Sequence, residues 1–317
     1  MFVELFAKTH VGRVRSGNED NFLVLDLSTS KAWTGSQGDT PPAEMRRFEV
    51  GEKGLVLVVS DGMGGALAGD VASRMAVETV RDMLTGGDEN DGEGEGENEV
   101  LYGPDAPLVE CLKNATDYAN FAIHRKSQED PRCSGMGATL TAAAVTHEGV
   151  SLLQVGDSRG YVLRGERIKL ATKDQSLVQQ LVDVGQISEE EAETHMFRNV
   201  ILQALGAQPE LAPVTGRVRV FRGDLLLLCS DGLSGKLRGE DMLQIVASSN
   251  GDLARACEAL VAEANDRGGE DNITVVLARL TGDDLRSPDT DRITVELPSP
   301  DGDDTISHED DTTERLA

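Results

Sequence analysis

The chain has few of the residues that form several common kinds of site. Its four cysteines are scattered with no Cys-x-x-Cys pair, and its five histidines show no ligand spacing. This argues against a zinc site and a disulfide framework, and it fits a reducing compartment. No apolar run approaches the roughly 20 residues of a membrane span, and the first residues lack the basic start of a secretory leader. We therefore expect a cytoplasmic location and no membrane partner.

Positive charge is also scarce. The 317 residues include 30 lysines and arginines against 56 aspartates and glutamates, a net charge of −26. Two segments hold most of the excess: Gly86–Glu99 has seven acids and no base, and Thr281–Ala317 has twelve acids and three arginines. We expect no nucleic-acid partner, because binding to a phosphate backbone needs a basic surface.

Composition suggests a boundary near residue 280. We predict one domain over residues 1–280, with an acidic loop at 86–107, followed by an acidic disordered tail over 281–317. Low-complexity acidic segments of this kind cannot bury enough apolar surface to fold. Within the tail, Ile293–Leu297 is compatible with a strand or a docking segment.

Aspartates stand at the ends of the apolar runs that predict strands. Three runs end at an aspartate and two begin just after one, and the five residues are Asp20, Asp61, Asp157, Asp231 and Asp271. A single Asp-Gly pair is most simply a turn. Five such positions, with Ser60-Asp61-Gly62 nearly repeated as Ser230-Asp231-Gly232, predict one shared site instead.

The order of the predicted elements indicates the fold class. Helices are predicted in pairs rather than after every strand, at Ala66–Leu84, Leu108–Arg125, Glu240–Ser248 and Leu253–Asp266. Short strands with tight connections fill most of the remainder, apart from a polar helical segment at Lys173–Ala204. This order excludes a doubly wound parallel sheet and predicts an α+β fold, in which helices pack outside antiparallel sheets.

Carboxylates without histidine or cysteine form a hard oxygen site that selects Mg²⁺ or Mn²⁺. Converging carboxylates repel one another unless cations neutralise them. Two divalent ions that share a carboxylate lower the pKa of a bound water, which can then attack phosphorus in line. Arg15, five residues before Asp20, is placed to hold phosphoryl oxygens in a bidentate manner. The alternative for Arg15 is a surface ion pair with Glu19.

Six motifs resemble those of the metal-dependent serine/threonine protein phosphatases of the 2C type, and most closely those of the compact bacterial members. They are Arg15-Ser-Gly-Asn-Glu-Asp20, Asp61-Gly-Met-Gly-Gly65, Gly135-Met-Gly-Ala-Thr139, Val155-Gly-Asp-Ser-Arg159, Ser230-Asp-Gly-Leu233 and Glu270-Asp-Asn-Ile-Thr274. The resemblance covers about Phe6 to Leu280. It implies a four-layer α-β-β-α sandwich with two central antiparallel sheets, a dinuclear site in a cleft at one sheet edge, and a flap at 172–205.

The resemblance also implies roles for individual residues. Asp61 resembles the carboxylate that bridges two metals, and Gly62 the residue whose carbonyl binds one of them. Asp231 and Asp271 resemble ligands of the first metal, and Asp157, with Asp231, resembles the ligands of a weaker third. Asp20 resembles the acid that acts through metal-bound water, with Glu19 outside it, and Arg15 resembles the phosphate-binding arginine.

Two positions depart from the family pattern. Gln175 follows Asp174 where histidine is common, and Met63, which cannot donate a proton, stands where many eukaryotic members have a histidine. Asp174 itself is most simply a helix cap. His195 in the flap is a candidate proton donor, although an exposed histidine without a catalytic role is at least as compatible with the sequence.

The resulting hypothesis is a metal-dependent enzyme that hydrolyses phosphoserine and phosphothreonine in proteins and opposes a bacterial serine/threonine kinase. Its expected partners are phosphorylated proteins and such a kinase, and we expect a monomer. Two alternatives stay open: a non-catalytic sensor that binds phosphoproteins, and a phosphomonoesterase with small-molecule substrates.

Overall fold

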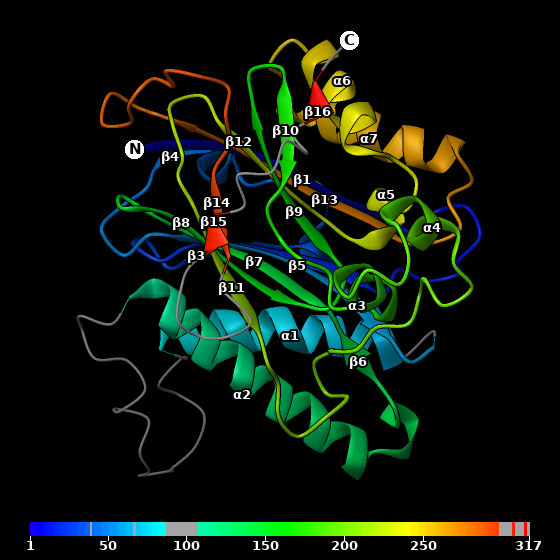
Figure 1. Cartoon of the computed structure of the whole chain (residues 1–317). Helices are drawn as coiled ribbons and strands as arrows, with labels where there is room; N and C mark the ends of the chain where they lie inside the picture. Colours follow the sequence, from blue (N-terminus) through cyan, green and yellow to red (C-terminus); the bar gives the residue numbers. More distant parts are fainter. Residues whose placement is uncertain (39, 66–67, 87–106, 298–305, 308–313, 316–317) are drawn as a thin grey trace.

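The computed structural model describes residues 1–38, 40–65, 68–86, 107–297, 306–307 and 314–315. Two sheets lie face to face, and helices cover the outer face of each (Figure 1). Every strand pair in the two sheets is antiparallel in the described part of the chain. The predicted α-β-β-α sandwich is therefore confirmed.

The first sheet has the strand order β16-β10-β9-β12-β13-β1-β4. Its strands are β1 (Phe2–His10), β4 (Arg47–Glu49), β9 (Arg159–Arg164), β10 (Arg167–Leu170), β12 (Leu225–Cys229), β13 (Ile273–Thr281) and β16 (Glu314–Arg315).

The second sheet has the strand order β15-β14-β11-β8-β7-β5-β2-β3, with β6 paired to β5. Its strands are β2 (Asp20–Asp26), β3 (Lys31–Thr34), β5 (Leu55–Met63), β6 (Gly137–Ala138), β7 (Leu140–Thr146), β8 (Gly149–Val155), β11 (Val214–Val218), β14 (Val295–Leu297) and β15 (Ile306–Ser307).

The helices occupy the outer layers and the segment between β10 and β11. They are α1 (Ala68–Thr85), α2 (Leu108–Glu129), α3 (Leu177–Asp183), α4 (Glu189–Thr194), α5 (Asp231–Ser234), α6 (Gly239–Ser248) and α7 (Leu253–Asp266). Short 3₁₀ turns are η1 (Gly35–Gln37), η2 (Ala43–Met45) and η4 (Pro131–Cys133). None of the described helices is long and apolar enough to cross a membrane.

Three hydrophobic layers hold the sandwich together. The central layer lies between the sheets, and Trp33 is buried there with its ring 4.8 Å from that of Phe22. A second layer lies between the second sheet and helices α1 and α2, and a third between the first sheet and helices α6 and α7. Both faces of β2 and β5 are therefore covered, which explains why these strands are apolar runs rather than alternating sequences.

The segment 28–53 contains two short strands. It contributes β3, whose residues pair with Leu23–Asp26, and β4, which pairs with the start of β1. These strands have three or four residues, so they carry no periodic signal in the sequence. Trp33 belongs to the central core layer.

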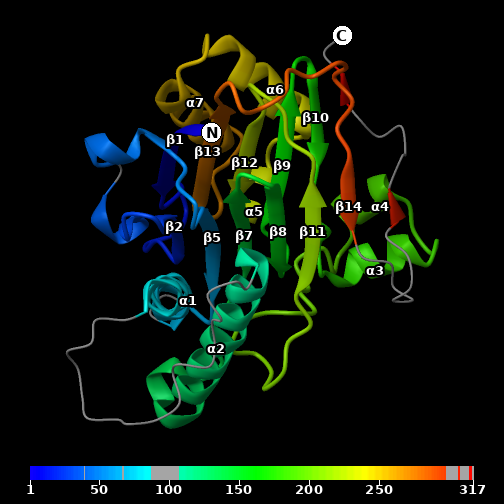
Figure 2. The same cartoon turned by 90° about the vertical axis from the view of Figure 1, so that its left-hand side faces the viewer.

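The C-terminal segment, residues 282–297, corrects part of the predicted disordered tail. Ile293 and Val295 are each 2% exposed and belong to the central core layer. Val295–Leu297 form β14, which pairs with β11 at the edge of the second sheet, where Figure 2 shows the two strands side by side. The strand compatible with the sequence is thus present, because its apolar residues cover the open edge of the core. The rest of the predicted tail, and the acidic loop at 87–106, lie mostly outside the described residues.

We expect Ile293→Ala to lower the free energy of unfolding by about 2–4 kcal/mol, the usual effect of emptying a buried isoleucine site. Ser287→Ala, at an exposed position of the same segment, should change it by less than about 0.5 kcal/mol. Urea denaturation of the three proteins measures both values. Equal stabilities would mean that the C-terminal segment is not part of the core.

Candidate active site

Asp20 and Asp61 lie directly opposite each other on neighbouring strands. The register of β2 and β5 pairs these two residues. Opposite residues of an antiparallel pair project from the same face with Cβ atoms about 4.5–5.5 Å apart, and like charges in this position are destabilising. The fold therefore places two carboxylates together where they repel each other unless they bind protons or cations.

The other three predicted aspartates lie at the same end of the two sheets. Asp157 follows β8, Asp231 begins α5 directly after β12, and Asp271 precedes β13. After burial, which is the largest cause, the charge of Asp271 raises the pKa of Asp231, and the charge of Asp231 raises that of Asp157. All five aspartates thus meet at one site, which we call the carboxylate cluster.

Burial is the main cause of the raised pKa values in the carboxylate cluster. It raises the pKa of Asp20 to about 7 and that of Asp157 to about 8. The pKa of Asp61 is also well above its usual range, first from burial and then from the charge of Asp20. Neighbouring groups of opposite charge normally lower the pKa values that burial raises, but the carboxylate cluster has too few of them to do so.

Unpaired oxygen atoms indicate what the cluster can hold. Among the described residues, four buried side-chain polar atoms have no hydrogen-bond partner, and three of them are Asp20 Oδ1, Asp157 Oδ1 and Asp231 Oδ1. Buried oxygens of this kind are costly unless they meet a cation or a donor. The donor set is purely carboxylate and fits Mg²⁺ or Mn²⁺. In the described part of the chain, no three acidic, histidine or cysteine side chains already form a ligand shell.

Hydrogen bonds from distant residues hold Asp20 and its strand in place. Ser230 Oγ donates to Asp20 Oδ2 at 2.7 Å and accepts from the Thr274 N–H. Asn272 Oδ1 accepts from the Glu19 N–H, and its Nδ2 donates to the main-chain oxygens of Val11 and Gly17. The sequence placed Ser230 and Asn272 inside motifs but assigned them no role, because their partners lie up to 261 residues away.

Thr139 fixes the strand end that carries Asp61. Its hydroxyl accepts from the Asp61 N–H at 3.0 Å, its own N–H donates to the Asp61 main-chain oxygen, and its main-chain oxygen accepts from Ser60 Oγ. The Thr139 hydroxyl also lies 2.7 Å from Ser158 Oγ, beside Asp157. Thr139 therefore connects the strand end that carries Asp61 with the segment that carries Asp157.

Gly62 follows Asp61 at a place where a side chain does not fit. A Cβ at this position would lie 2.1 Å from the main-chain oxygen of Gly69. The Gly62 N–H donates to the Glu19 main-chain oxygen, and the Glu19 carboxylate is packed against Gly69 near the start of α1. Burial raises the pKa of Glu19. Glu19 is buried beside the cluster, and the outer role predicted for it stays a prediction.

Arg15 lies at the edge of the cluster and pairs with Asp271 rather than with Glu19. Its Nη2 atom donates to Asp271 Oδ2 at 2.8 Å, while 47% of its side chain is exposed. The hydrogen bond that Arg15 donates to Asp271 is the main reason that the pKa of Arg15 is raised. The guanidinium therefore keeps donors available to an anion that approaches from solvent.

The flap segment 172–205 joins the cluster through two hydrogen-bonded contacts at its base. Arg159 donates from Nε and Nη2 to the two carboxylate oxygens of Asp174, and Gln175 Oε1 accepts from the Gly156 N–H. The prediction that Asp174 caps a helix is wrong, because Ser176 caps α3 and Asp174 is used by Arg159.

The flap itself contains α3 and α4. His195 ends α4, where its Nδ1 accepts from the Phe197 N–H and its ring packs 5.6 Å from the Phe197 ring. These contacts lie within the flap. The proposed role of His195 as a proton donor therefore stays a prediction.

The raised pKa values predict how metal binding depends on pH. Asp20, with a pKa of about 7, holds a proton at pH 6 that a cation must displace. We expect the affinity for Mn²⁺, measured by calorimetry on metal-free protein, to be at least about tenfold weaker at pH 6 than at pH 8. An affinity that is equal at the two pH values would contradict these protonation states.

The same raised pKa values determine whether the free energy of unfolding of the metal-free protein rises or falls with pH. The folded protein keeps protons on these carboxyls, whereas the unfolded chain loses them near the ordinary value of 3.8. The free energy of unfolding should accordingly fall as pH rises from about 4 through 7 and then level off, as far as Asp20 is concerned.

Comparison with known proteins agrees with this geometry. The family profile of protein phosphatase 2C matches residues 44–277. The chain belongs to the protein phosphatase 2C family. The resemblance read from six motifs is therefore confirmed.

Several known proteins are similar to this chain over most of its length. The serine/threonine phosphatase stp of Listeria innocua is 34% identical over 270 residues, which are 85% of this chain and 93% of stp. Protein phosphatase PhpP of Streptococcus pneumoniae is 38% identical over 229 residues, which are 72% of this chain and 87% of PhpP. The solved catalytic domain of PstP in complex with two manganese ions is 30% identical, with a TM-score of 0.64, 89% of this chain and 99% of PstP being covered.

Proposed function

We propose that this chain is a metal-dependent protein-serine/threonine phosphatase that uses the carboxylate cluster as its catalytic centre. Membership of the protein phosphatase 2C family and relatives named as serine/threonine phosphatases support the reaction class. The observation that carries the assignment to this site is the meeting of five aspartates with three unpaired buried oxygens. The manganese in solved PstP supports divalent cations as cofactors.

The roles we propose for the side chains are those that the family resemblance implies, and the position of Asp61 supports its role. Asp61 would be shared between two cations, because it lies opposite Asp20 and its pKa also responds to Asp231, Asp157 and Asp271. Asp231 and Asp271 would hold one ion, and Asp157 with Asp231 a weaker third. When bound, such ions supply an activated water and neutralise charge on the phosphoryl oxygens. Ser230 keeps Asp20 oriented, with one carboxylate oxygen fixed and the other available.

Arg15 would hold the phosphate of the substrate. We expect Arg15→Ala to raise KM for a phosphothreonine peptide and to lower kcat/KM by about 10–100-fold, equivalent to about 1.4–2.7 kcal/mol. The loss follows from removing a charge-assisted contact to the phosphoryl oxygens. Arg15→Lys should recover only part of it, because an ammonium group cannot bind in a bidentate manner.

A control separates this role from support of the metal site. Arg15 also pairs with Asp271, so affinity for Mn²⁺ must be measured on the same variants. The proposal for Arg15 fails if kcat/KM stays within twofold of wild type, or if the loss is matched by an equal loss of Mn²⁺ affinity.

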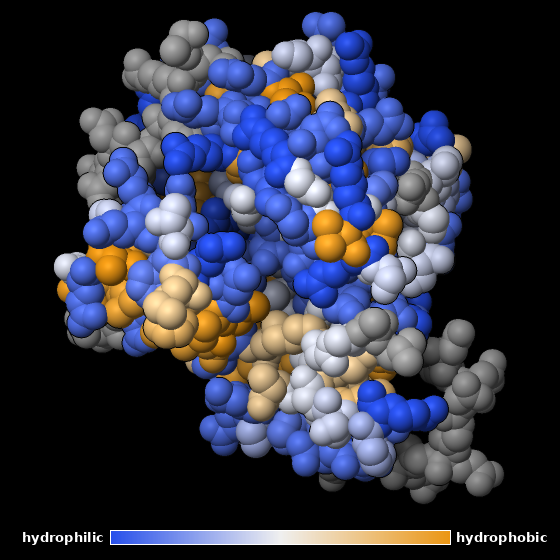
Figure 3. All heavy atoms as spheres, turned by 90° about the vertical axis from the view of Figure 1, so that its right-hand side faces the viewer, coloured by the Kyte–Doolittle hydropathy of each residue, from blue (hydrophilic) through white to orange (hydrophobic). Residues whose placement is uncertain are grey.

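The surface beside the site favours a protein substrate. The flap exposes five large apolar side chains: Val184, Met196, Phe197, Val200 and Leu202. Figure 3 shows the face on which the flap lies, where apolar groups gather in patches within a hydrophilic surface. Exposed apolar groups next to a polar site fit contact with a polypeptide better than with a small polar sugar phosphate.

A substrate comparison tests the proposed function. With Mn²⁺ present, a phosphothreonine peptide should be hydrolysed with a kcat/KM at least tenfold above that of glucose 6-phosphate. The reverse order would favour the small-molecule phosphomonoesterase, and absence of any turnover by folded, metal-loaded protein would favour the non-catalytic sensor. A kinase partner, a monomeric state and a cytoplasmic location are further parts of the proposal; the last is supported by four cysteines that form no disulfide bond.

A further inference from the structure

A second polar pocket lies away from the carboxylate cluster. It has a volume of about 200 Å³ and is formed where the ends of β9 and β11 meet the C-terminal segment. Arg164 ends β9, whereas Arg159 begins it beside the cluster. Five residue steps of about 3.3 Å put the two ends roughly 16 Å apart. The pocket is therefore distinct from the proposed catalytic centre.

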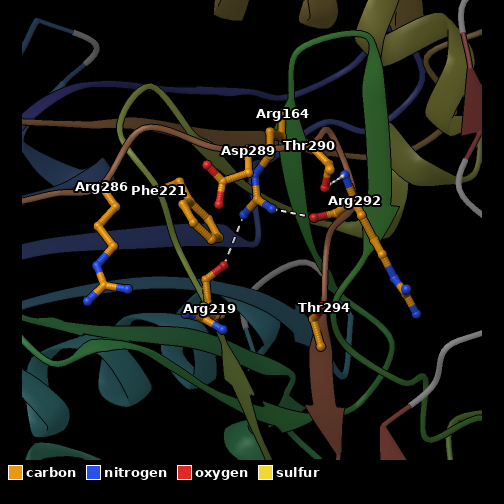
Figure 4. A pocket seen from close by; sticks show the side chains of 8 residues that line it. All are labelled: Arg164, Arg219, Phe221, Arg286, Asp289, Thr290, Arg292 and Thr294. Carbon is orange, nitrogen blue, oxygen red and sulfur yellow. Dashed lines mark hydrogen bonds between the residues drawn. The ribbon is translucent and has the colours of Figure 1, made fainter.

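Arg164 forms the buried floor of the pocket. Its side chain is 3% exposed, and its Nε and Nη2 atoms donate to the two carboxylate oxygens of Asp224 at 2.8 and 2.7 Å. Nη1 donates to the Arg292 main-chain oxygen, and Nη2 also donates to that of Arg219 (Figure 4). A guanidinium has five N–H donors. These four contacts leave one Nη1 hydrogen, on a group that the fold holds rigidly.

Three further arginines stand around Arg164. Figure 4 shows Arg286 on one side of the Phe221 ring and Arg292 on the other side of Arg164. Arg219 packs over the Phe221 ring at 5.6 Å, and Arg164 packs over the same ring at 4.4 Å. Within the described part of the chain, the side chains of Arg219 and Arg286 form no ion pair. Their positive charges are thus exposed to an incoming anion.

The charge balance of the pocket is opposite to that of the chain. Asp224 offsets the charge of Arg164 beneath the floor, and the two charges of Arg219 and Arg286 exceed the single charge of Asp289 in the lining, so the pocket is positive. The chain as a whole carries −26. Guanidinium groups match the oxygens of phosphate in geometry, and a phosphate group at neutral pH carries close to two negative charges. The hydroxyl groups of Thr290 and Thr294 in the same lining offer further donors.

We propose that this arginine-lined pocket binds a phosphate group. The group comes either from free inorganic phosphate or from a phosphorylated side chain of a protein, and both sources present the same oxygens. The pocket is built partly from the C-terminal segment, which lies beyond residue 277 where the family match ends. It is thus a property of this chain in addition to its proposed catalytic centre.

Calorimetry on metal-free, full-length Arg15→Ala protein tests the pocket, since that background lacks the proposed catalytic phosphate contacts. Inorganic phosphate should bind at one saturable site. Arg219→Glu and Arg286→Glu should each weaken that binding at least tenfold. Arg217→Glu is the matched control, because Arg217 is exposed on β11 but does not line the pocket, and it should leave the affinity within twofold.

A phosphothreonine peptide of neutral sequence then distinguishes the two sources. Tighter binding of the peptide than of inorganic phosphate, with the same dependence on Arg219 and Arg286, indicates a phosphorylated protein segment. Equal affinities indicate the free anion. Both results support the pocket.

Two results would overturn the proposal. These are absence of saturable phosphate binding, and binding unchanged by Arg219→Glu and Arg286→Glu. Each glutamate variant, made with Arg15 intact, should keep Mn²⁺-dependent phosphothreonine turnover, which shows that the protein is folded.

Discussion

Asp61→Asn should abolish metal-dependent hydrolysis and at the same time stabilise the metal-free protein. Asp61 lies opposite Asp20 and feels the charges of three other aspartates, so it is the centre of the carboxylate cluster. Removing its charge removes a shared metal ligand, and we expect kcat/KM for a phosphothreonine peptide to fall at least about a thousandfold, or about 4 kcal/mol.

The gain in stability has the same origin. Burial and repulsion from Asp20 raise the pKa of Asp61 well above its ordinary value. A neutral amide therefore avoids the loss of folding free energy that this carboxyl group causes in the wild type at pH 7.5. One pKa unit corresponds to about 1.4 kcal/mol, and we expect at least that increase in the free energy of unfolding without metal. Urea denaturation with a chelator measures it. Asp117→Asn, at an exposed position of α2, should change neither quantity.

The role of Asp61 is tested by measuring both the activity and the metal-free stability of Asp61→Asn. A loss of activity together with a loss of metal-free stability would mean that Asp61 is mainly structural. Retained activity would remove it from the metal site. The account also requires that Mn²⁺ stabilise the wild type much more than the variant.

Asp224→Ala should destabilise the protein by about 3–5 kcal/mol, the usual effect of leaving a buried charge without its partner. Asp224 is fully buried, and it binds both Arg164 and the main-chain N–H of Phe221. The guanidinium of Arg164, itself buried, would keep its charge because an arginine does not lose its proton in proteins.

A second substitution separates the charge from the packing. Arg164→Met combined with Asp224→Ala removes both charges and should recover at least half of the loss, because no uncompensated ion then remains in the interior. Thermal or urea unfolding of the single and double variants measures this difference. If the double variant is as unstable as Asp224→Ala, the hydrogen bonds from Arg164 to main-chain oxygens, and not the ion pair, account for the effect.

Strand ends could be predicted from the sequence because buried strands leave a strong signal. The strands before Asp61 and Asp231 are almost entirely apolar, and Gln154 interrupts the apolar run before Asp157, since helices or the opposite sheet cover both faces. An aspartate that interrupts such a run therefore marks the sheet edge. Five of these edges gave the positions of the carboxylates, and the register of β2 and β5 explains why two of them meet.

Contacts between distant residues could not be predicted in this way. Ser230, Thr139 and Asn272 organise the site through hydrogen bonds across 44 to 261 residues, and no local pattern distinguishes them from other polar residues. The prediction for Asp174 was wrong for the same reason. Its position before a helix suggested a cap, but its partner Arg159 lies on β9. The acidic residues around Ile293 favoured a disordered tail, although two apolar residues suffice to attach the segment to the core.

The most direct test of the central claim is turnover of a phosphothreonine peptide by the full chain with and without Mn²⁺, for wild type and for Asp231→Asn. Asp231 carries one of the unpaired buried oxygens, and burial and then the charge of Asp271 raise its pKa. The account predicts hydrolysis that requires Mn²⁺ in the wild type and falls at least about a hundredfold in Asp231→Asn, with Asp117→Asn unchanged. Hydrolysis that is independent of metal, or equal in wild type and Asp231→Asn, would contradict a metal centre built on these aspartates.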